Sequence, residues 1–493
     1  MILGIFFFSS LLFSSLFSSG FRLTEQSLNG TALSSAYIAG AYGADSTYYN
    51  PANMGWDDNN KHELEINATM IYIPAFDFVT EGRDKGMTLT CTGSALTDSA
   101  CSDIRGSYGG GAAEVEGKGN KTLQPVPKIF YKTRSYNLFG IKTNFGLSFT
   151  TPSGLAMDWD GEGGGFLDDV MIMMLELNPV VSFKLSDHFS FAVGIRGLYS
   201  SGEFNNTLYV PIAYTTTQGM MGQNATVDAK GTTKVTQSSN AAASGLGYNF
   251  ALTIRPFTKS DFRIAVTYRT NIHMDMKGSL SATSYVDMGQ MASGTIGMDA
   301  DLTLSADLPP ILNIAFMKSF GRLQTEFVIE KTYYGSADIF EFSYSNQRFT
   351  NNVSGKVCGL YLFGKCTTWV DTASYIDPAQ MLGAADYSAV AYGNGWKDAM
   401  AYRLGLTFNY SPKLKLMGSF AYDKTPAPQG QFGIPDANAY VFGAGLRYQI
   451  WNGKGDVGIA YNIALKDNSK SFVQSKDGMG QLQLLTMGAK YRF

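Results

Sequence analysis

The C-terminal residues of the chain alternate between apolar and polar or small side chains. Apolar residues stand at every second position from 485 to 493, and threonine, glycine, lysine and arginine lie between them. A period of two residues is typical of a β-strand with one apolar face. After residue 60 the alternation recurs in segments of about ten residues or more, longer than the usual strand of about five or six residues. The pattern predicts an all-β fold, an antiparallel transmembrane β-barrel.

About fourteen such segments can be counted, an even number as in bacterial barrels. They lie near residues 62–73, 125–133, 138–151, 171–185, 189–205, 244–256, 262–276, 301–318, 322–335, 397–410, 413–424, 439–450, 456–466 and 481–493. Short connections such as 135–137 alternate with long ones, which include loops around 206–243 and 277–300 and the long loop 336–395. Short periplasmic turns and long extracellular loops produce this asymmetry.

Composition excludes other classes of protein. Only 16% of the 493 residues are charged, against about 25% in soluble domains. The mean hydropathy of −0.06, with one long apolar run at the N-terminus, argues against a bundle of transmembrane helices. The net charge of −3 gives no basic surface, so we expect no nucleic-acid partner.

The chain divides into three predicted parts. Residues 1–20 form an apolar stretch with small residues before Phe21, which indicates a signal peptide, although a membrane anchor is the alternative. Residues 21–60 do not alternate and are rich in Ala, Gly, Ser and Tyr, which predicts an N-terminal hatch (plug) inside the lumen or, alternatively, a flexible periplasmic tail. Residues 61–493 form the barrel with its long extracellular loops.

The four cysteines stand in two local pairs within long loops, Cys91 with Cys101 and Cys358 with Cys366. Four cysteines allow three connectivities; local pairing closes two short loops, so we predict two disulfides facing the outside, formed in an oxidising compartment. Neither spacing suits zinc, and the three histidines lie far apart in sequence. We therefore expect no metal, no cofactor and no enzymatic activity.

Several motifs resemble one family of outer-membrane transporters. Residues 21–27 read FRLTEQS and residues 43–54 read GADSTYYNPANM; both are similar to the mature N-terminus and hatch of the FadL/TodX (OmpP1) family. Further similar segments follow in order, including TPSGLA from residue 151, LNPVV from 177 and DKTPAP from 423. The terminal Phe493, with Tyr491 before it, resembles the signature read by the barrel assembly machinery of Gram-negative bacteria.

The resemblance implies a monomeric fourteen-stranded barrel in the bacterial outer membrane. Family members import long-chain fatty acids or other hydrophobic compounds passively. The substrate is captured between extracellular loops, passes to a pocket beside the hatch, and leaves sideways through a gap in the wall into the lipopolysaccharide-containing membrane. Two alternatives stay open, a substrate-specific porin and a surface adhesin or receptor acting through its disulfide-closed loops.

Candidate site residues fall into three groups. Thr151, Pro152, Ser153 and Gly154 are expected to form the lateral opening, because Pro removes a hydrogen-bond donor from the ladder and Gly tolerates unusual dihedrals; the alternative is that Pro152 begins a loop. Asn50, Pro51 and Ala52 are expected to hold the hatch against the wall, with Asn50 bonded to strand backbone; the alternative is a plain turn. The expected ligand-binding residues are Arg196, Met157, Trp159, Phe166, Met220 and Met221.

Arg196 is the expected carboxylate anchor, because it points into the lumen by alternation. Interior ion pairing is the alternative for each lumenal Arg. Methionines suit promiscuous apolar binding because they are flexible and polarizable. The basic residues that family members use for a carboxylate have no clear match after Tyr199 or Tyr334, which leaves room for a neutral hydrocarbon.

Overall fold

The structure is a computed structural model, and the description covers the greater part of the chain. The described residues are 22–57, 60–81, 87–92, 101, 105–108, 114–160, 168–220, 223–289, 291–362, 365–371, 373, 376–382, 389–393, 395–427, 437–467, 474–475 and 481–493. The predicted signal peptide lies outside them.

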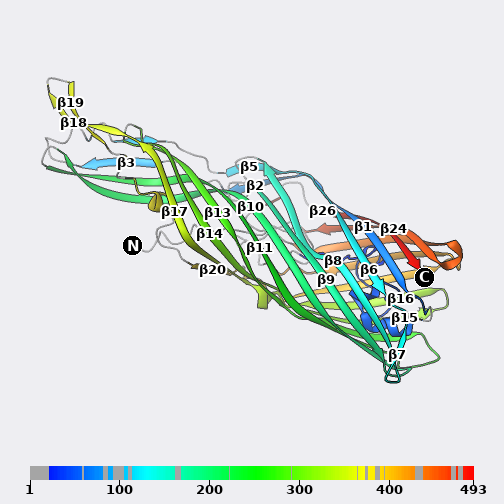
Figure 1. The fold of residues 1–493 in the computed structure, drawn as a ribbon. Helices are drawn as coiled ribbons and strands as arrows, with labels where there is room; N and C mark the ends of the chain where they lie inside the picture. Colours follow the sequence, from blue (N-terminus) through cyan, green and yellow to red (C-terminus); the bar gives the residue numbers. More distant parts are fainter. Residues whose placement is uncertain are drawn as a thin grey trace.

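Fourteen of the described strands form a closed antiparallel barrel (Figure 1). The ring closes where the last strand pairs with the first, from Glu63 opposite Arg492 to Tyr72 opposite Gln483. Its order is β1 (Glu63–Ile73), β6 (Thr122–Lys132), β8 (Ile141–Asp160), β9 (Asp169–Lys184), β10 (Phe189–Met220), β11 (Gln223–Ile254), β12 (Phe262–Arg269), β15 (Ile311–Phe320), β16 (Leu323–Thr332), β21 (Ala399–Asn409), β22 (Leu414–Asp423), β23 (Ala439–Ile450), β24 (Gly455–Lys466) and β26 (Gln481–Arg492). The predicted fold class is confirmed.

The alternation in sequence becomes an alternation in burial. In β26, Tyr491 is 45% exposed on the outer face and Lys490 is 2% exposed on the inner face. Exposed apolar side chains recur on the outer faces of the other strands, whereas many inner positions hold charged or amide side chains. This is the arrangement of a barrel whose outside faces lipid. None of the described helices is long and apolar enough to cross a membrane.

Two regions expected to be loops, 206–243 and 277–300, are instead largely strand, and this corrects the prediction. Strands β10 and β11 have 32 residues each, far more than the roughly 9–11 that cross a bilayer. The segments expected at 262–276 and 301–318 each divide in two. Strand β13 (Ile272–Asp287) follows β12, and β14 (Ser293–Leu308) precedes β15.

These strands form an outer extension beyond the lipid-facing barrel. We define the outer extension as β10 from Ser200, β11 up to Ser244, β13, β14 and β17 (Ile339–Ser354). The last large apolar side chains exposed on β10 and β11 before it are Tyr199 and Leu246. Further out, the exposed described side chains of these two strands are polar or small. The outer extension was missed in the sequence because its outer face carries Ser, Thr and Asn, which are typical of loops.

Smaller strands flank the outer extension, some of them at the end opposite the short turns (Figure 1). They are β3 (Met87–Thr92), β4 (Gly106–Tyr108), β18 (Lys356–Leu362), β19 (Lys365–Asp371) and β20 (Ala389–Gly393). Beside them are β2 (Phe76–Glu81), β5 (Glu114–Gly119) and β25 (Gln474–Ser475), which form a small sheet, and β7 (Tyr136–Leu138) lies at the short-turn end.

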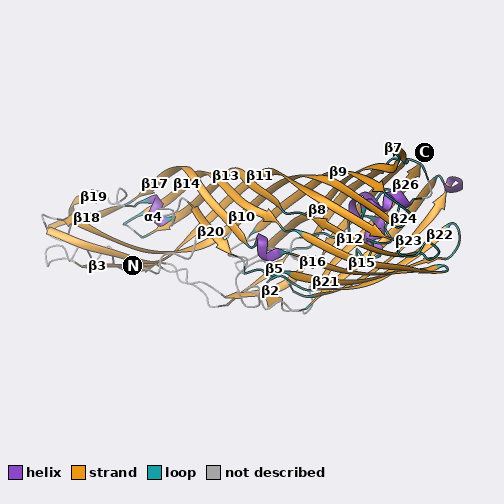
Figure 2. Cartoon of the chain, turned by 90° about the horizontal axis from the view of Figure 1, so that it is seen from below, coloured by secondary structure: helices purple, strands orange, loops and turns teal. Residues whose placement is uncertain are grey.

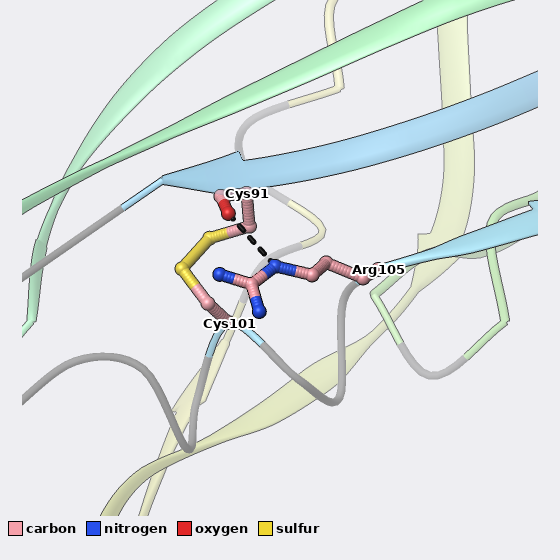
Figure 3. The surroundings of a disulfide bond; sticks show 3 residues. All are labelled: Cys91, Cys101 and Arg105. Carbon is pink, nitrogen blue, oxygen red and sulfur yellow. Dashed lines mark hydrogen bonds between the residues drawn. A yellow bond between two sulfur atoms is a disulfide. The ribbon is translucent and has the colours of Figure 1, made fainter. Parts of the chain in front are cut away.

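The two predicted disulfides are confirmed. Cys91 is bonded to Cys101 and Cys358 to Cys366. Figure 3 shows the first pair, where Arg105 Nε donates to the carbonyl oxygen of Cys91 at 2.9 Å. The second disulfide joins β18 to β19, a two-stranded sheet of its own.

The N-terminal segment fills the short-turn end of the barrel. It contains α1 (Leu28–Ala32), α2 (Ser46–Tyr49) and the 3₁₀ helix η1 (Pro51–Trp56), and almost every residue from 22 to 56 is buried. In Figure 1 its blue helices lie among the strands, and Figure 2 shows most helices near the C-terminal end, with α4 (Pro378–Met381) near the other. The remaining 3₁₀ turns are η3 (Tyr334–Ala337) and η5 (Trp451–Gly453).

Close packing of this segment on wall glycines gives a testable prediction. A Cβ at Gly443 would lie 2.6 Å from the carbonyl oxygen of Ala32 and 2.8 Å from that of Thr31. Gly443→Val should therefore push α1 away from the wall and raise ion conductance through the purified protein in planar bilayers. Gly418→Ala is the matched control, because its Cβ would meet nothing closer than 3.8 Å. Equal conductance of the two variants would contradict this packing.

Candidate functional site

A wall carboxylate anchors the centre of the N-terminal segment. Glu326 on β16 accepts hydrogen bonds from the backbone N–H groups of Ile38, Ala39 and Gly40 at 2.6, 2.6 and 3.0 Å. Charge-assisted hydrogen bonds are about twice as strong as neutral ones. The bonds satisfy three N–H groups that lie outside any helix or strand. Glu326 thus fixes this loop to the wall.

Buried ion pairs bind the same segment elsewhere. Arg22 is paired with Glu330 at 3.1 Å, and Glu330 also binds Arg403 at 3.2 Å. Arg403 Nη1 in turn donates to the carbonyl oxygen of Ser34 at 3.2 Å. On the opposite side, Arg447 donates to Asn29 Oδ1 at 3.1 Å. Because an unpaired buried charge is strongly unfavourable, these contacts hold the segment in one position.

The expected hatch residues lie at a contact between this segment and β11. Asn50 Nδ2 donates to Thr253 Oγ1 and to the carbonyl oxygen of Ile38, both at 2.9 Å. Its Oδ1 accepts from the N–H of Ala52 at 3.2 Å, and Pro51 begins η1. The wall contact is thus to a side chain, whereas strand backbone was expected. Asn53, which the sequence analysis did not single out, donates to three carbonyls of the same loop.

The wall has an unpaired stretch between β6 and β8. These strands pair only over residues 129–132 of β6 and 146–149 of β8, although β6 continues back to Thr122 and β8 on to Asp160. Just past the last pair, β8 bulges against β9 between Thr150 and Ser153. A bulge bends its strand and increases the local twist. The two strands therefore part at this level.

Two prolines explain why the edge of β6 tolerates being unpaired. The ladder between β1 and β6 is continuous through Pro125 and Pro127. Thr133 N–H donates to the carbonyl oxygen of Phe145 on β8 at 2.9 Å. Successive residues of an antiparallel strand direct their backbone groups to opposite neighbours, so the missing N–H groups of Pro125 and Pro127, an even number of residues away, belong to the edge facing β8. The prolines remove donors that would otherwise be unsatisfied in hydrocarbon. Proline at alternate positions of a strand was the sequence signal for this opening, and it was missed.

The N-terminal segment bonds the other edge of the opening. Leu23 N–H donates to the carbonyl oxygen of Pro152 at 2.9 Å. Gln26 Nε2 donates to the carbonyl oxygen of Thr151 at 2.7 Å, and its Oε1 accepts from Thr151 N–H at 3.1 Å. We call residues 22–26 the strap. The alternative that Pro152 begins a loop is wrong, since β8 runs on to Asp160.

An apolar cavity of about 270 Å³ lies at this opening. Thr151 and Gly154, two of the four residues expected at a lateral opening, line it, and Ser153 forms a bridge to Arg22 of the strap beside it. Its lining residues are Leu23, Ile71, Ile73, Thr122, Gln124, Pro125, Val126, Pro127, Phe149, Thr151, Gly154, Met171, Ile172, Met173 and Leu175. The cavity thus borders the strap, the bulge and both prolines.

The expected ligand-binding residues are not brought together. Arg196 is buried and paired with Glu176 at 2.8 Å, and Glu176 also pairs with Arg269. Arg196 Nη1 donates to the carbonyl oxygen of Thr270 at 2.7 Å. Thr270 lies in the short interruption between strands β12 and β13. A substrate carboxylate would have to compete with Glu176, so its role as an anchor stays a prediction.

The other ligand candidates are only partly described. Phe166 and Met221 lie outside the described residues, and of Met157, Trp159 and Met220 only the backbone is described, in β8 and β10. Of the described residues, no group of three or more His, Cys, Asp or Glu could hold a metal ion.

The fold and site define a class of protein, an outer-membrane β-barrel with an internal plug. The family model for outer membrane transport proteins (OMPP1/FadL/TodX) matches residues 9–493, so the chain belongs to that family of hydrophobic-compound transporters and is an outer-membrane protein. The long-chain fatty acid transport protein of Escherichia coli K12 is 21% identical over 68% of this chain and 70% of its own length.

Solved structures show the same fold. A Pseudomonas aeruginosa FadL homologue has a TM-score of 0.64 at 14% identity, covering 96% of this chain and 100% of its own. The Ralstonia pickettii toluene transporter TbuX has a TM-score of 0.59 at 12% identity, with coverages of 96% and 100%. At these identities the likeness supports the fold alone.

The Glu326 anchor gives a second testable prediction. Glu326→Gln keeps the shape but loses the charge, and we expect this to weaken the three hydrogen bonds by roughly 1.5–3 kcal/mol in total. Hydrogen exchange of the peptide that contains Ile38, Ala39 and Gly40 should become at least about tenfold faster, since about 1.4 kcal/mol corresponds to a factor of ten. Glu203→Gln, at an exposed position of β10, is the control. Unchanged exchange at residues 38–40 would refute the anchor.

Proposed function

We propose that this protein imports hydrophobic compounds, such as fatty acids or hydrocarbons, across the outer membrane passively and without covalent chemistry. Substrate enters through the outer extension, reaches the lumen above the plug, and leaves sideways between β6 and β8 into the membrane. Lateral exit suits such a substrate because the saccharide layer of lipopolysaccharide, rather than the hydrocarbon, is its barrier.

The observation that carries this proposal is the apolar cavity at the unpaired edges of β6 and β8. A stable break in a membrane-spanning wall requires every exposed backbone donor to be satisfied or absent. The prolines of β6 and the bonds from the strap to β8 meet this requirement at Pro125, Pro127 and Thr151. The lining of the cavity is mostly aliphatic, which suits a hydrocarbon chain or ring.

The strap supports a route that opens without disturbing the rest of the plug. Leu23 and Gln26 of the strap bond the backbone of Thr151 and Pro152, whereas Glu326 and Arg403 hold residues 34–40 elsewhere. Displacing the strap would free the edge of β8 beside the cavity while the anchored loop stays in place. Release is thus separable from opening an aqueous channel.

A substrate-specific porin is supported less well. The N-terminal segment binds strands on several sides of the lumen, including β11, β16, β21 and β23. Such a plug opposes steady ion flow, which a porin requires.

Recognition of Phe493 by the assembly machinery stays a prediction.

Blocking the cavity tests the exit. Val126 lines it, and Leu123, three residues away on β6, is 58% exposed on the outer face. Val126→Trp should lower uptake of radiolabelled dodecanoate and toluene at least about tenfold in cells that lack their own transporter, because the indole fills the cavity.

Leu123→Trp is the matched control, with the same residue introduced on the lipid-facing side of the same strand. It should leave uptake within about twofold of the unaltered protein, since Trp is common at membrane–water interfaces. If both variants transport normally while present as folded barrels, the substrate does not leave between β6 and β8.

A further inference from the structure

A group of buried polar side chains inside the outer extension has no hydrogen-bonding partner. Asn206 on β10 and Gln237 on β11 are each 1% exposed, and both atoms of each amide are unbonded. The hydroxyl of Ser239 is also buried and unbonded. We call Asn206, Gln237 and Ser239 the amide patch.

The three residues share one inner face. Asn206 stands directly opposite Gln237 in the ladder between β10 and β11, and Ser239 is two residues from Gln237. Side chains opposite each other on adjacent strands lie within reach of one another. The two amides nevertheless leave all of their donors and acceptors free for a third group.

The surroundings of the amide patch are apolar. Phe204 lies opposite Ser239 on β10, and Ala282 and Leu280 of β13 lie opposite Gln237 and Ser239. Met298 of β14 continues this row next to Ala282. Phe204, Leu280, Ala282 and Met298 all belong to one buried apolar cluster. A polar group in such surroundings is unfavourable unless it is hydrogen-bonded.

The buried side chains described in this part of the interior carry no charge. Every buried residue of the outer extension that the structure describes is uncharged, and the buried cations closest in sequence on β10 and β12 are Arg196 and Arg269, both below it. Among these described residues an ionised carboxylate would find no buried counter-ion at the amide patch. Amides and a hydroxyl together offer donors and acceptors, which suits an uncharged group that both donates and accepts.

We propose that the amide patch binds the uncharged polar head of an amphipathic hydrophobe, such as a long-chain alcohol or primary amide. The apolar tail of this molecule lies along the Phe204, Leu280 and Met298 side of the interior. This site belongs to the entry route and rests on the proposed function. It distinguishes uncharged amphiphiles from both alkanes and fatty acid anions.

The test measures equilibrium binding of radiolabelled 1-dodecanol, dodecane and dodecanoate to the full-length protein in lipid nanodiscs. In the double variant N206L/Q237L, which replaces each amide with an aliphatic side chain, dodecanol should bind about tenfold more weakly. This is the loss expected for about two hydrogen bonds. Dodecane binding should stay within about twofold.

The matched control is S238A/N240L, which changes the outer face of the same strand at exposed positions. It should leave all three affinities unchanged. If the double variant does not fold, Q237M with S239A replaces it, because both substitutions remove polar atoms with little change of volume.

Two outcomes overturn the proposal. Either dodecanol binds the double variant as tightly as the unaltered protein, or all three compounds lose affinity equally, which would indicate disturbed packing. Binding in nanodiscs does not require passage through the wall. Failure of the proposed exit would appear instead as normal uptake by Val126→Trp, so the two failures are distinguishable.

Discussion

The structure depends on one constraint, that every backbone N–H and C=O group in the membrane must be satisfied within the protein. A closed ladder of fourteen strands meets it over most of the wall, and the pairing of β26 with β1 closes the ring. An opening in such a wall conflicts with the same constraint. Here the conflict is reduced on one side by Pro125 and Pro127, which have no N–H donor and leave only their carbonyl groups at the edge, and on the other by a strap that bonds the exposed edge of β8.

The polar lumen imposes a second constraint, which explains the plug. Inward-facing arginines and carboxylates cannot be left unpaired away from water. The N-terminal segment supplies partners for several of them: Arg22 for Glu330, backbone N–H groups for Glu326, and the carbonyl of Ser34 for Arg403. Wall and plug therefore stabilise each other. If the strap moved, Arg22 would move with it, and the plug would stay seated through the contacts of Glu326, Arg403 and Arg447.

Sequence periodicity predicted the barrel because a lipid-facing strand must be apolar at every second position, and β26 shows this most clearly. It did not predict the outer extension. Beyond Tyr199 the exposed positions of β10 and β11 carry polar or small side chains, so apolar and polar residues no longer alternate clearly. Prediction of single site residues would have required knowing which side chains from other strands lie beside them. Asn50 bonds the side chain of Thr253 on β11, and Arg196 pairs with Glu176 from β9 and bonds the carbonyl of Thr270. Such partners come from distant parts of the chain, and periodicity carries no information about them.

The distribution of buried charge separates the interior into two regions. Around the plug, charged groups are frequent and paired. In the outer extension the described buried residues are apolar or neutral, with methionines such as Met274, Met276 and Met298 among them. A hydrophobic molecule entering from outside would therefore meet flexible apolar side chains first and paired charges only at the plug. The cavity between β6 and β8 is again apolar, so the lateral exit that we propose would let the molecule avoid the charged region. The position of the opening beside the strap, rather than below the plug, follows from this arrangement.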